Sequence, residues 1–186
     1  MYASHDSFTY GKPRRWYQWL LQPFSKTQNL TIEQQIAEGV RCFDLRVRFG
    51  KNGQLIACHG LSEYKVNVFT EILRIEKAGC YYRIVLENVL GARKTSDDDL
   101  LKLRLSFNTP EHPQCIYVTE KKNWFGTPNP FCTLKWKEWN HFKDFSGYKF
   151  LPVPRLFVRR YLADKFAHSC NLDQQNIHYY DFVEIK

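Results

Sequence analysis

The sequence lacks the features that mark membrane-spanning and secreted proteins. No run of residues reaches the about 18 apolar residues that a transmembrane helix needs. The N-terminus has no apolar stretch followed by a small-residue cleavage site, so no signal peptide is predicted. Internal repeats and low-complexity segments are also missing. We expect a cytoplasmic protein whose contact with membranes, if it has one, is peripheral.

The cysteines show no C-x-x-C spacing, which argues against a zinc site or a redox dithiol. Most of them lie in apolar runs, where free thiols are commonly buried. This usage favours a reducing compartment. The six cysteines are Cys42, Cys58, Cys80, Cys115, Cys132 and Cys170.

The 186 residues suffice for one domain with a core, and the chain is 44% apolar and 25% charged. Its net charge of +8 favours an anionic partner: a nucleic acid, an anionic membrane or a phosphorylated substrate. Lysine and arginine are spread along the chain and no base-reading motif is present, so the nucleic-acid alternative ranks last.

Hydrophobic periodicity predicts alternating strands and helices. Such β-α units indicate a mostly parallel sheet with helices outside, either a (β/α) barrel or a doubly wound sheet. Residues 121–150 follow neither period. Strands are expected at 1–4, 40–49, 55–60, 81–88, 115–120 and 177–182, and helices at 16–22, 31–39, 66–79, 96–107 and 154–171.

Several details of these elements can be predicted. Thr31 is an expected N-cap with Gln34 completing a capping box, and Ser96 an expected N-cap. Pro23 is expected to end the first helix. The helix at 66–79 is expected to face the core with an apolar side formed by Val68, Ile72, Leu73 and Ile75.

Polar groups able to catalyse reactions stand at the ends of four predicted strands. They are His5-Asp6, Asp44 with Arg46, His59 and Asp181. In a (β/α) barrel, residues at the carboxyl ends of the strands converge on one rim. Two imidazoles and a guanidinium at one rim suit the cleavage of a phosphodiester, with one base, one acid and one cation for the phosphoryl oxygens.

These residues resemble the X-domain of phosphatidylinositol-specific phospholipase C. The resemblance is carried by "SHDSFTYG" at 4–11 and by "TQNLTIEQQIAEGVRCFDLRVRF" and "GQLIACHGL" within 27–61, and more loosely by "RIVLEN" and "IHYYDF". It covers about the first third of the chain strongly. H-D, then D-x-R, then H-G in this order is far more specific than any one motif.

The resemblance implies a shortened or distorted (β/α) TIM-type barrel, with residues 1–186 forming a single catalytic domain. His5 is similar to the general base, assisted by Asp181, and His59 to the general acid, paired with Asp6. Arg46 is similar to the arginine that contacts the phosphate. The implied reaction is attack of the inositol 2-hydroxyl on its own 1-phosphate, which yields diacylglycerol and a cyclic inositol phosphate.

The same resemblance bears on metals. Calcium-dependent members resemble this chain at Glu87, but they have Asn after the first histidine and an acidic residue in place of Arg46. A guanidinium there would occupy and repel the cation site. We therefore predict no calcium and no other cofactor, with Asp44 and Glu87 orienting Arg46 through charge-assisted hydrogen bonds.

Each of these residues also has a plainer interpretation. Asp6 is typical of a turn, Asp44 and Arg46 of a structural ion pair, and Asp181 matches only as an aspartate after a late strand. The other histidines are expected to be structural or exposed. They are His112, His141, His168 and His178.

Two segments are candidates for lipid contact. "PRRWYQWLLQPF" combines arginines with Trp16 and Trp19, as interfacial segments do, although a barrel helix with buried tryptophans fits equally. Lys121 and Lys122 follow a predicted strand and could reach an anionic headgroup; the alternative is a solvated loop.

The main alternative function is a non-catalytic lipid- or phosphate-binding module on the same fold. A full (β/α) barrel takes about 250 residues, so a shorter chain implies reduced units in its second half. The start at Met1 also predicts a pared-down version of the fold. The presence of both histidines and the arginine favours the enzyme, and phosphatidylinositol as substrate rests on the resemblance alone.

Overall fold

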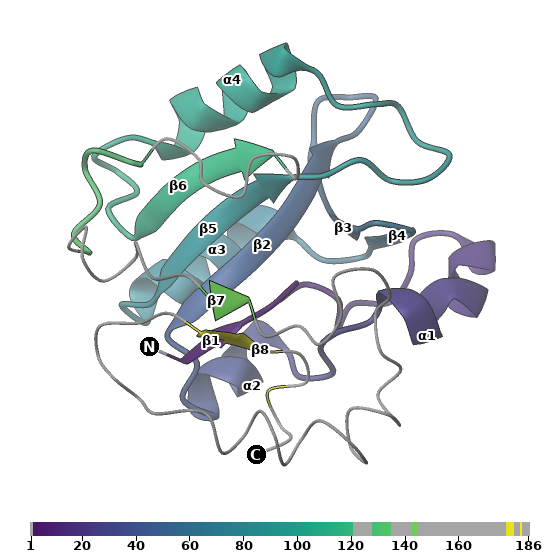
Figure 1. Cartoon of the computed structure of the whole chain (residues 1–186), viewed down its shortest axis with the longest axis horizontal. Coiled ribbons are helices and arrows are strands. Elements are labelled where there is room, and N and C mark those ends of the chain that lie inside the picture. The colour runs from purple at the N-terminus through teal and green to yellow at the C-terminus, as the bar shows by residue number, and fades with distance from the viewer. Residues whose placement is uncertain (1, 121–127, 135–142, 145–177, 181–182, 184–186) are drawn as a thin grey trace.

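The computed structural model describes residues 2–120, 128–134, 143–144, 178–180 and 183 (Figure 1). Short strands and helices alternate in this part of the chain. In order they are β1 (Tyr2–Ser4), the 3-10 helix η1 (Trp16–Leu21), α1 (Gln22–Ser25), α2 (Ile32–Ala37), β2 (Cys42–Phe49), β3 (Leu55–His59), β4 (Ser62–Tyr64), α3 (Val68–Lys77), β5 (Tyr81–Leu86), α4 (Asp97–Phe107), β6 (Cys115–Glu120), β7 (Lys143–Asp144) and β8 (His178–Tyr180).

Strand β2 joins the two halves of the sheet. It pairs in parallel with β1 on one side and with β5 on the other, and β5 pairs in parallel with β6. Strand β8 lies parallel to β1 and β7 parallel to β8. The hairpin β3-β4 adds to the carboxyl-terminal half of β2 in antiparallel orientation, with Val47 opposite Ala57.

The predicted α/β class with a mostly parallel sheet is therefore confirmed. Among the described strands the pairing runs from β7 to β6 without joining those two ends, so this part of the chain forms an open sheet and does not show a closed barrel. The short antiparallel strand β4 was not predicted from the sequence. Its three residues, Ser62 to Tyr64, are too few to show a period.

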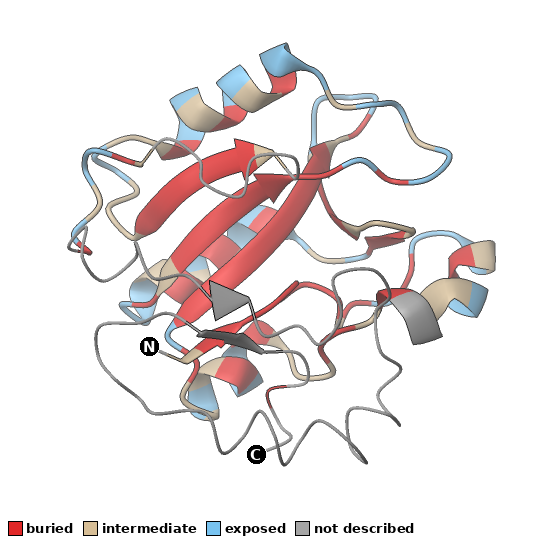
Figure 2. Ribbon diagram, viewed as in Figure 1, coloured by how far each residue is buried: buried red, intermediate tan, exposed pale blue. Residues whose placement is uncertain are grey.

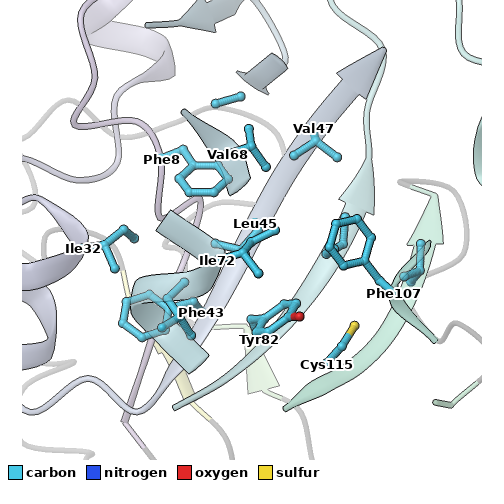
Figure 3. Close-up of a cluster of buried hydrophobic side chains, with 14 of the residues drawn as sticks. Phe8, Ile32, Phe43, Leu45, Val47, Val68, Ile72, Tyr82, Phe107 and Cys115 are labelled. Atoms are coloured by element: carbon cyan, nitrogen blue, oxygen red, sulfur yellow. The ribbon is translucent and has the colours of Figure 1, made fainter. Parts of the chain in front are cut away.

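The two faces of β2 have different chemistry. Phe43, Leu45 and Val47 belong to the main hydrophobic core, which α3 covers (Figure 3). The alternate residues of the same strand carry the charges of Asp44, Arg46 and Arg48, and they are buried as well (Figure 2). Because successive side chains of a strand point to opposite faces, the core on one face fixes the charged row on the other.

The capping predictions are confirmed. Thr31 and Gln34 form a capping box at the start of α2, and Ser96 accepts a hydrogen bond from Asp99 N at the start of α4. The prediction that Pro23 ends the first helix is wrong. Pro23 lies in the first turn of α1, where proline is tolerated because its missing N–H would have no partner.

One of the four core residues predicted for α3 does not face the core. Val68, Ile72 and Ile75 are buried as predicted, whereas Leu73 is 54% exposed. Three residues spaced by three and four already fill the buried side, and Leu73, next to Ile72, turns away from it.

Some predictions lie outside the described residues, namely the helix at 154–171 and Cys170. The other five cysteines form no disulfide, and four of them are buried, as predicted. None of the helices that the structure describes is long and apolar enough to cross a bilayer.

Candidate active site

The first candidate group stands in the turn that follows β1. His5 and Asp6 come directly after Ser4, and Ser7 N donates to the Asp44 carbonyl oxygen at 2.9 Å, which ties the turn to β2. Asp6 adopts a φ of 45°, a left-handed conformation that aspartate tolerates better than most residues. Buried Gln28 donates to the His5 carbonyl oxygen at 2.9 Å. The turn is thus held from two sides.

Arg46 lies at the centre of three buried carboxylates. Its Nε contacts Oδ1 of Asp6 and donates to Oδ2 of Asp44 at 3.1 Å, and its NH1 donates to Oε2 of Glu87 at 3.4 Å. The predicted orientation of Arg46 by Asp44 and Glu87 is therefore present in the structure. The plainer interpretation of Asp44 and Arg46 as an ion pair is also correct, because the two groups are paired.

His5 reaches the same guanidinium. Its Nε2 lies 2.7 Å from NH2 of Arg46. Because a guanidinium only donates, this ring nitrogen accepts, and the proton of the neutral ring belongs on Nδ1, which lies 3.3 Å from Oδ2 of Asp6. The hydrogen-bond pattern therefore suits a neutral His5 whose Nε2 can take up a proton.

His59 approaches Asp6 from the end of β3. Its Nδ1 lies 2.8 Å from the Ser25 carbonyl oxygen, which can only accept, so Nδ1 carries a proton. Its Nε2 lies 3.1 Å from Oδ2 of Asp6, which is an ion-pair distance. The pair of His59 and Asp6, predicted from the sequence, is therefore in contact.

The two aspartates beside Arg46 differ in their ionisation. Burial raises the pKa of Asp6 above its ordinary value, against the opposing effect of Arg46 and both histidines. Burial acts in the same direction on Asp44, but Arg83, Arg46 and His5 together outweigh it and hold the pKa of Asp44 far below its usual range. Asp44 is thus a fixed negative charge, and Asp6 is the carboxyl better able to share a proton.

Solvent reaches only part of this cluster. The side chains of Asp6 and Asp44 are fully buried, that of Arg46 is 4% exposed, and those of His5 and His59 are 7% and 13% exposed. A ligand that enters the site would therefore meet the two imidazoles and the edge of the guanidinium before it met a carboxylate.

Two triads within the cluster have donor atoms close enough together to hold a metal ion. One is His5, Asp6 and Asp44, and the other is Asp6, His59 and Glu87. Arg46 contacts a carboxylate of each triad, and the three carboxylates concerned are its own ion-pair partners. A cation would have to displace or approach this guanidinium, which disfavours metal binding by either triad.

Three predicted site residues, Asp181, Lys121 and Lys122, lie outside the described residues. Their described neighbours are informative: Tyr180 pairs with Ser4, the residue immediately before His5, and Glu120 is the last residue of β6.

Two buried polar residues next to the site were missed. Arg83 of β5 donates from Nε to Oδ1 of Asp44 at 2.8 Å and from NH1 to the Tyr117 hydroxyl at 3.2 Å. The sequence held one signal for Arg83, a charge in the middle of an otherwise apolar strand. Tyr117 carried none, because tyrosine is common in strands.

The segment with tryptophans is exposed. Trp16 is 80% exposed, Trp19 55% and Leu20 75%, so the interpretation of this segment as a helix with buried tryptophans is wrong. Helix η1 leads directly into α1, whose Ser25 carbonyl oxygen binds His59. The apolar surface therefore adjoins the candidate site.

Comparisons with known proteins find structures of similar fold. The sequence matches no protein-family model, and no curated protein matches it. Phosphatidylinositol-specific phospholipase C from Listeria monocytogenes superposes with a TM-score of 0.62 at 15% identity, over 100% of this chain and 89% of that one. The Staphylococcus aureus enzyme, from work on its membrane binding, superposes with a TM-score of 0.51 at 14% identity, over 96% and 70%. At such identities the likeness shows the fold alone, which is mixed α/β and TIM-barrel-like.

Proposed function

We propose that this protein is a metal-independent phosphodiesterase of the phosphatidylinositol-specific phospholipase C type. The observation that carries the proposal is the arrangement of the two histidines. His5 presents an accepting Nε2 beside Arg46, and Nε2 of His59 lies 3.1 Å from Oδ2 of Asp6. A base, an acid and a cation at one site are what cleavage of a phosphodiester by an internal hydroxyl requires.

In the proposed reaction the inositol 2-hydroxyl attacks its own 1-phosphate. Nε2 of His5 takes the hydroxyl proton as the new O–P bond forms, and the bond from phosphorus to the glycerol oxygen breaks. A proton on Nε2 of His59, beside Asp6, passes to that oxygen, which leaves as diacylglycerol. Arg46 offsets the charge that grows on the non-bridging oxygens, and each histidine contributes about 10²- to 10⁴-fold to the rate.

The roles of the remaining predicted residues follow from their neighbours. Asp181 is proposed to orient His5 because the residue before it, Tyr180, pairs with the residue before His5. Lys121 and Lys122 are proposed to contact anionic groups of the lipid headgroup, since they follow the carboxyl end of β6, and β6 belongs to the same parallel set of strands as β1, which leads into His5.

Contact with a phospholipid surface is proposed for η1. Trp16, Trp19 and Leu20 are exposed, and Arg15 beside them is positively charged. Leu90, which follows β5, is 68% exposed, and its N–H donates to the Gly60 carbonyl oxygen at 3.2 Å, next to His59. The exposed apolar groups of these two segments would lie against the lipids that supply the substrate.

The proposed function is tested by product formation. Purified protein is incubated with phosphatidylinositol vesicles in the presence of a chelator, and the reaction is followed by phosphorus NMR. The expected product is a cyclic inositol phosphate, absent when His5→Ala replaces the wild type. If the wild type binds the vesicles but forms no phosphate product, the protein is the non-catalytic binding module instead.

A further inference from the structure

Arg83 is a buried arginine on β5, the strand that pairs with the strand of Arg46. It stands on β5 directly opposite Asp44 of β2, and its side chain is only 3% exposed. Nε donates to Oδ1 of Asp44 at 2.8 Å, and NH1 donates to the Tyr117 hydroxyl of β6 at 3.2 Å. Arg83 thus connects three neighbouring strands beneath the candidate site.

The two oxygens of Asp44 have separate partners. Arg83 binds Oδ1, whereas Oδ2 accepts from Nε of Arg46 at 3.1 Å and from the Asp6 backbone N–H at 3.3 Å. A carboxylate is planar and rigid, so a bond that fixes one oxygen also fixes the direction of the other. The position of Oδ2 toward Arg46 therefore depends on Arg83.

We propose that Arg83 is a positioning residue of the phosphodiesterase reaction: by binding Oδ1 of Asp44 it directs Oδ2 toward Arg46 and the Asp6 backbone, and so keeps Arg46 and His5 in place for the phosphoryl group. This inference rests on the proposed function. Arg83 does not itself touch the substrate in this account, because Asp44 and Arg46 lie between it and the exposed edges of the histidines.

Charge gives Arg83 a second effect on His5. The groups around the His5 ring include Asp6 from its own turn, Asp44 and Arg46 from β2, and His59 from β3. Arg83 is the strongest of the groups that hold Asp44 ionised with a lowered pKa. Without Arg83 the site would be more negative by one charge, which favours the protonated ring of His5.

Kinetics of Arg83→Gln and Arg83→Lys test the proposal. For Arg83→Gln we expect kcat to fall about 10- to 100-fold, the usual cost of a misplaced catalytic group, with KM changed less than about threefold. The acid limb of the kcat/KM profile should move to higher pH, because His5 must lose a proton to act as base. Arg83→Lys restores the charge without the planar fork, so the acid limb should recover more than kcat.

Arg48→Gln is the matched control. Arg48 is also a buried arginine on the charged face of β2, but it binds Glu63 and the Arg93 carbonyl oxygen. We expect Arg48→Gln to lose stability while its acid limb stays where the wild type has it. An equal shift of the acid limb in Arg48→Gln and Arg83→Gln would overturn the proposal, because the effect would then be general damage.

An NMR titration separates this inference from the proposed function. The His5 ring resonances are followed against pH in the wild type and in Arg83→Gln, without substrate. The midpoint should move to higher pH in the variant, whether or not the wild type turns over phosphatidylinositol. An unchanged midpoint would refute the role of Arg83 even if the enzyme is active, and an inactive wild type with a shifted midpoint would refute only the proposed function.

Discussion

The imidazole rings of His5 and His59 lie with their centroids 6.4 Å apart and their planes at 75° to each other. The carboxylate of Asp6 stands within 3.3 Å of Nδ1 of the first ring and 3.1 Å of Nε2 of the second. One ring comes from the turn after β1 and the other from the end of β3, and both lie beside one carboxylate, yet only His5 accepts from Arg46. This asymmetry is what the division into base and acid depends on.

The two aspartates of the site should affect stability in opposite ways. An aspartate in the unfolded chain has a pKa of about 3.9. The folded pKa of Asp44 is lower, so its contribution is present above about pH 4 and lost as the pH falls toward the folded value. The folded pKa of Asp6 is raised, so its contribution is present below about pH 4 and lost as the pH rises through the folded value.

Urea unfolding of Asp44→Asn and Asp6→Asn at pH 7 checks these signs. Asp44→Asn should lose about 3–5 kcal/mol, because Arg83 and Arg46 would keep buried charges without their partner. Asp6→Asn should stay within about 1 kcal/mol of the wild type or above it, since asparagine also tolerates a positive φ. Equal losses in the two variants would contradict the assignment.

Replacement of Trp16 and Trp19 by alanine should weaken vesicle binding without loss of chemistry. Burial of a large apolar side chain is worth about 1.5–3 kcal/mol, so the double variant should bind anionic vesicles at least about tenfold more weakly. Hydrolysis of a soluble substrate should not change. Phe131→Ala is the control, since Phe131 is 47% exposed but lies in the segment beside the start of β6. Loss of binding in this control would mean that the effect is not specific to η1.

Calcium should neither bind nor be needed. Arg46 contacts Asp6, Asp44 and Glu87, which are the carboxylates that a cation would use. Activity in chelator should equal activity in added calcium, and a calorimetric titration should give no heat of binding. Tight binding of calcium to the wild type would show that Arg46 does not block the site.

The exposed and buried sides of α3 can be tested by stability alone. Ile75→Ala removes a fully buried side chain of the core and should cost about 2–5 kcal/mol in unfolding free energy. Leu73→Ala should stay within about 0.5 kcal/mol of the wild type, because Leu73 is 54% exposed. A large loss for Leu73→Ala would mean that a partner covers this side of the helix.

The first part of the chain was predictable because its signals are local. The capping box at Thr31, the N-cap at Ser96 and the strand predicted at 40–49 each depend on a few neighbouring residues, and each is present in the structure. His5, Asp6 and His59 could be grouped because they follow or end predicted strands, and the expected barrel brings strand ends to one rim. In the structure they contact one another around Arg46, which lies inside β2, although β3 runs antiparallel to β2.

What the sequence could not supply depends on tertiary contacts. The exposure of Trp16 and Leu73 is decided by which side of each helix meets the sheet, and an apolar residue does not indicate this by itself. Arg83 joins the site only because the register of β2 and β5 places it opposite Asp44. Strand register depends on packing across the whole sheet, and no local pattern around Arg83 specifies its partner.

The central claim, that His5 is the base and His59 the acid, is tested most directly by the leaving group. Inositol phosphodiesters with an alkyl leaving group and with a nitrophenyl leaving group are compared in the wild type, His5→Ala and His59→Ala. A nitrophenolate needs no proton to depart, so His59→Ala should lose about 10²- to 10⁴-fold on the alkyl substrate and far less on the nitrophenyl one, whereas His5→Ala should lose equally on both. Equal losses of His59→Ala on the two substrates would contradict the account.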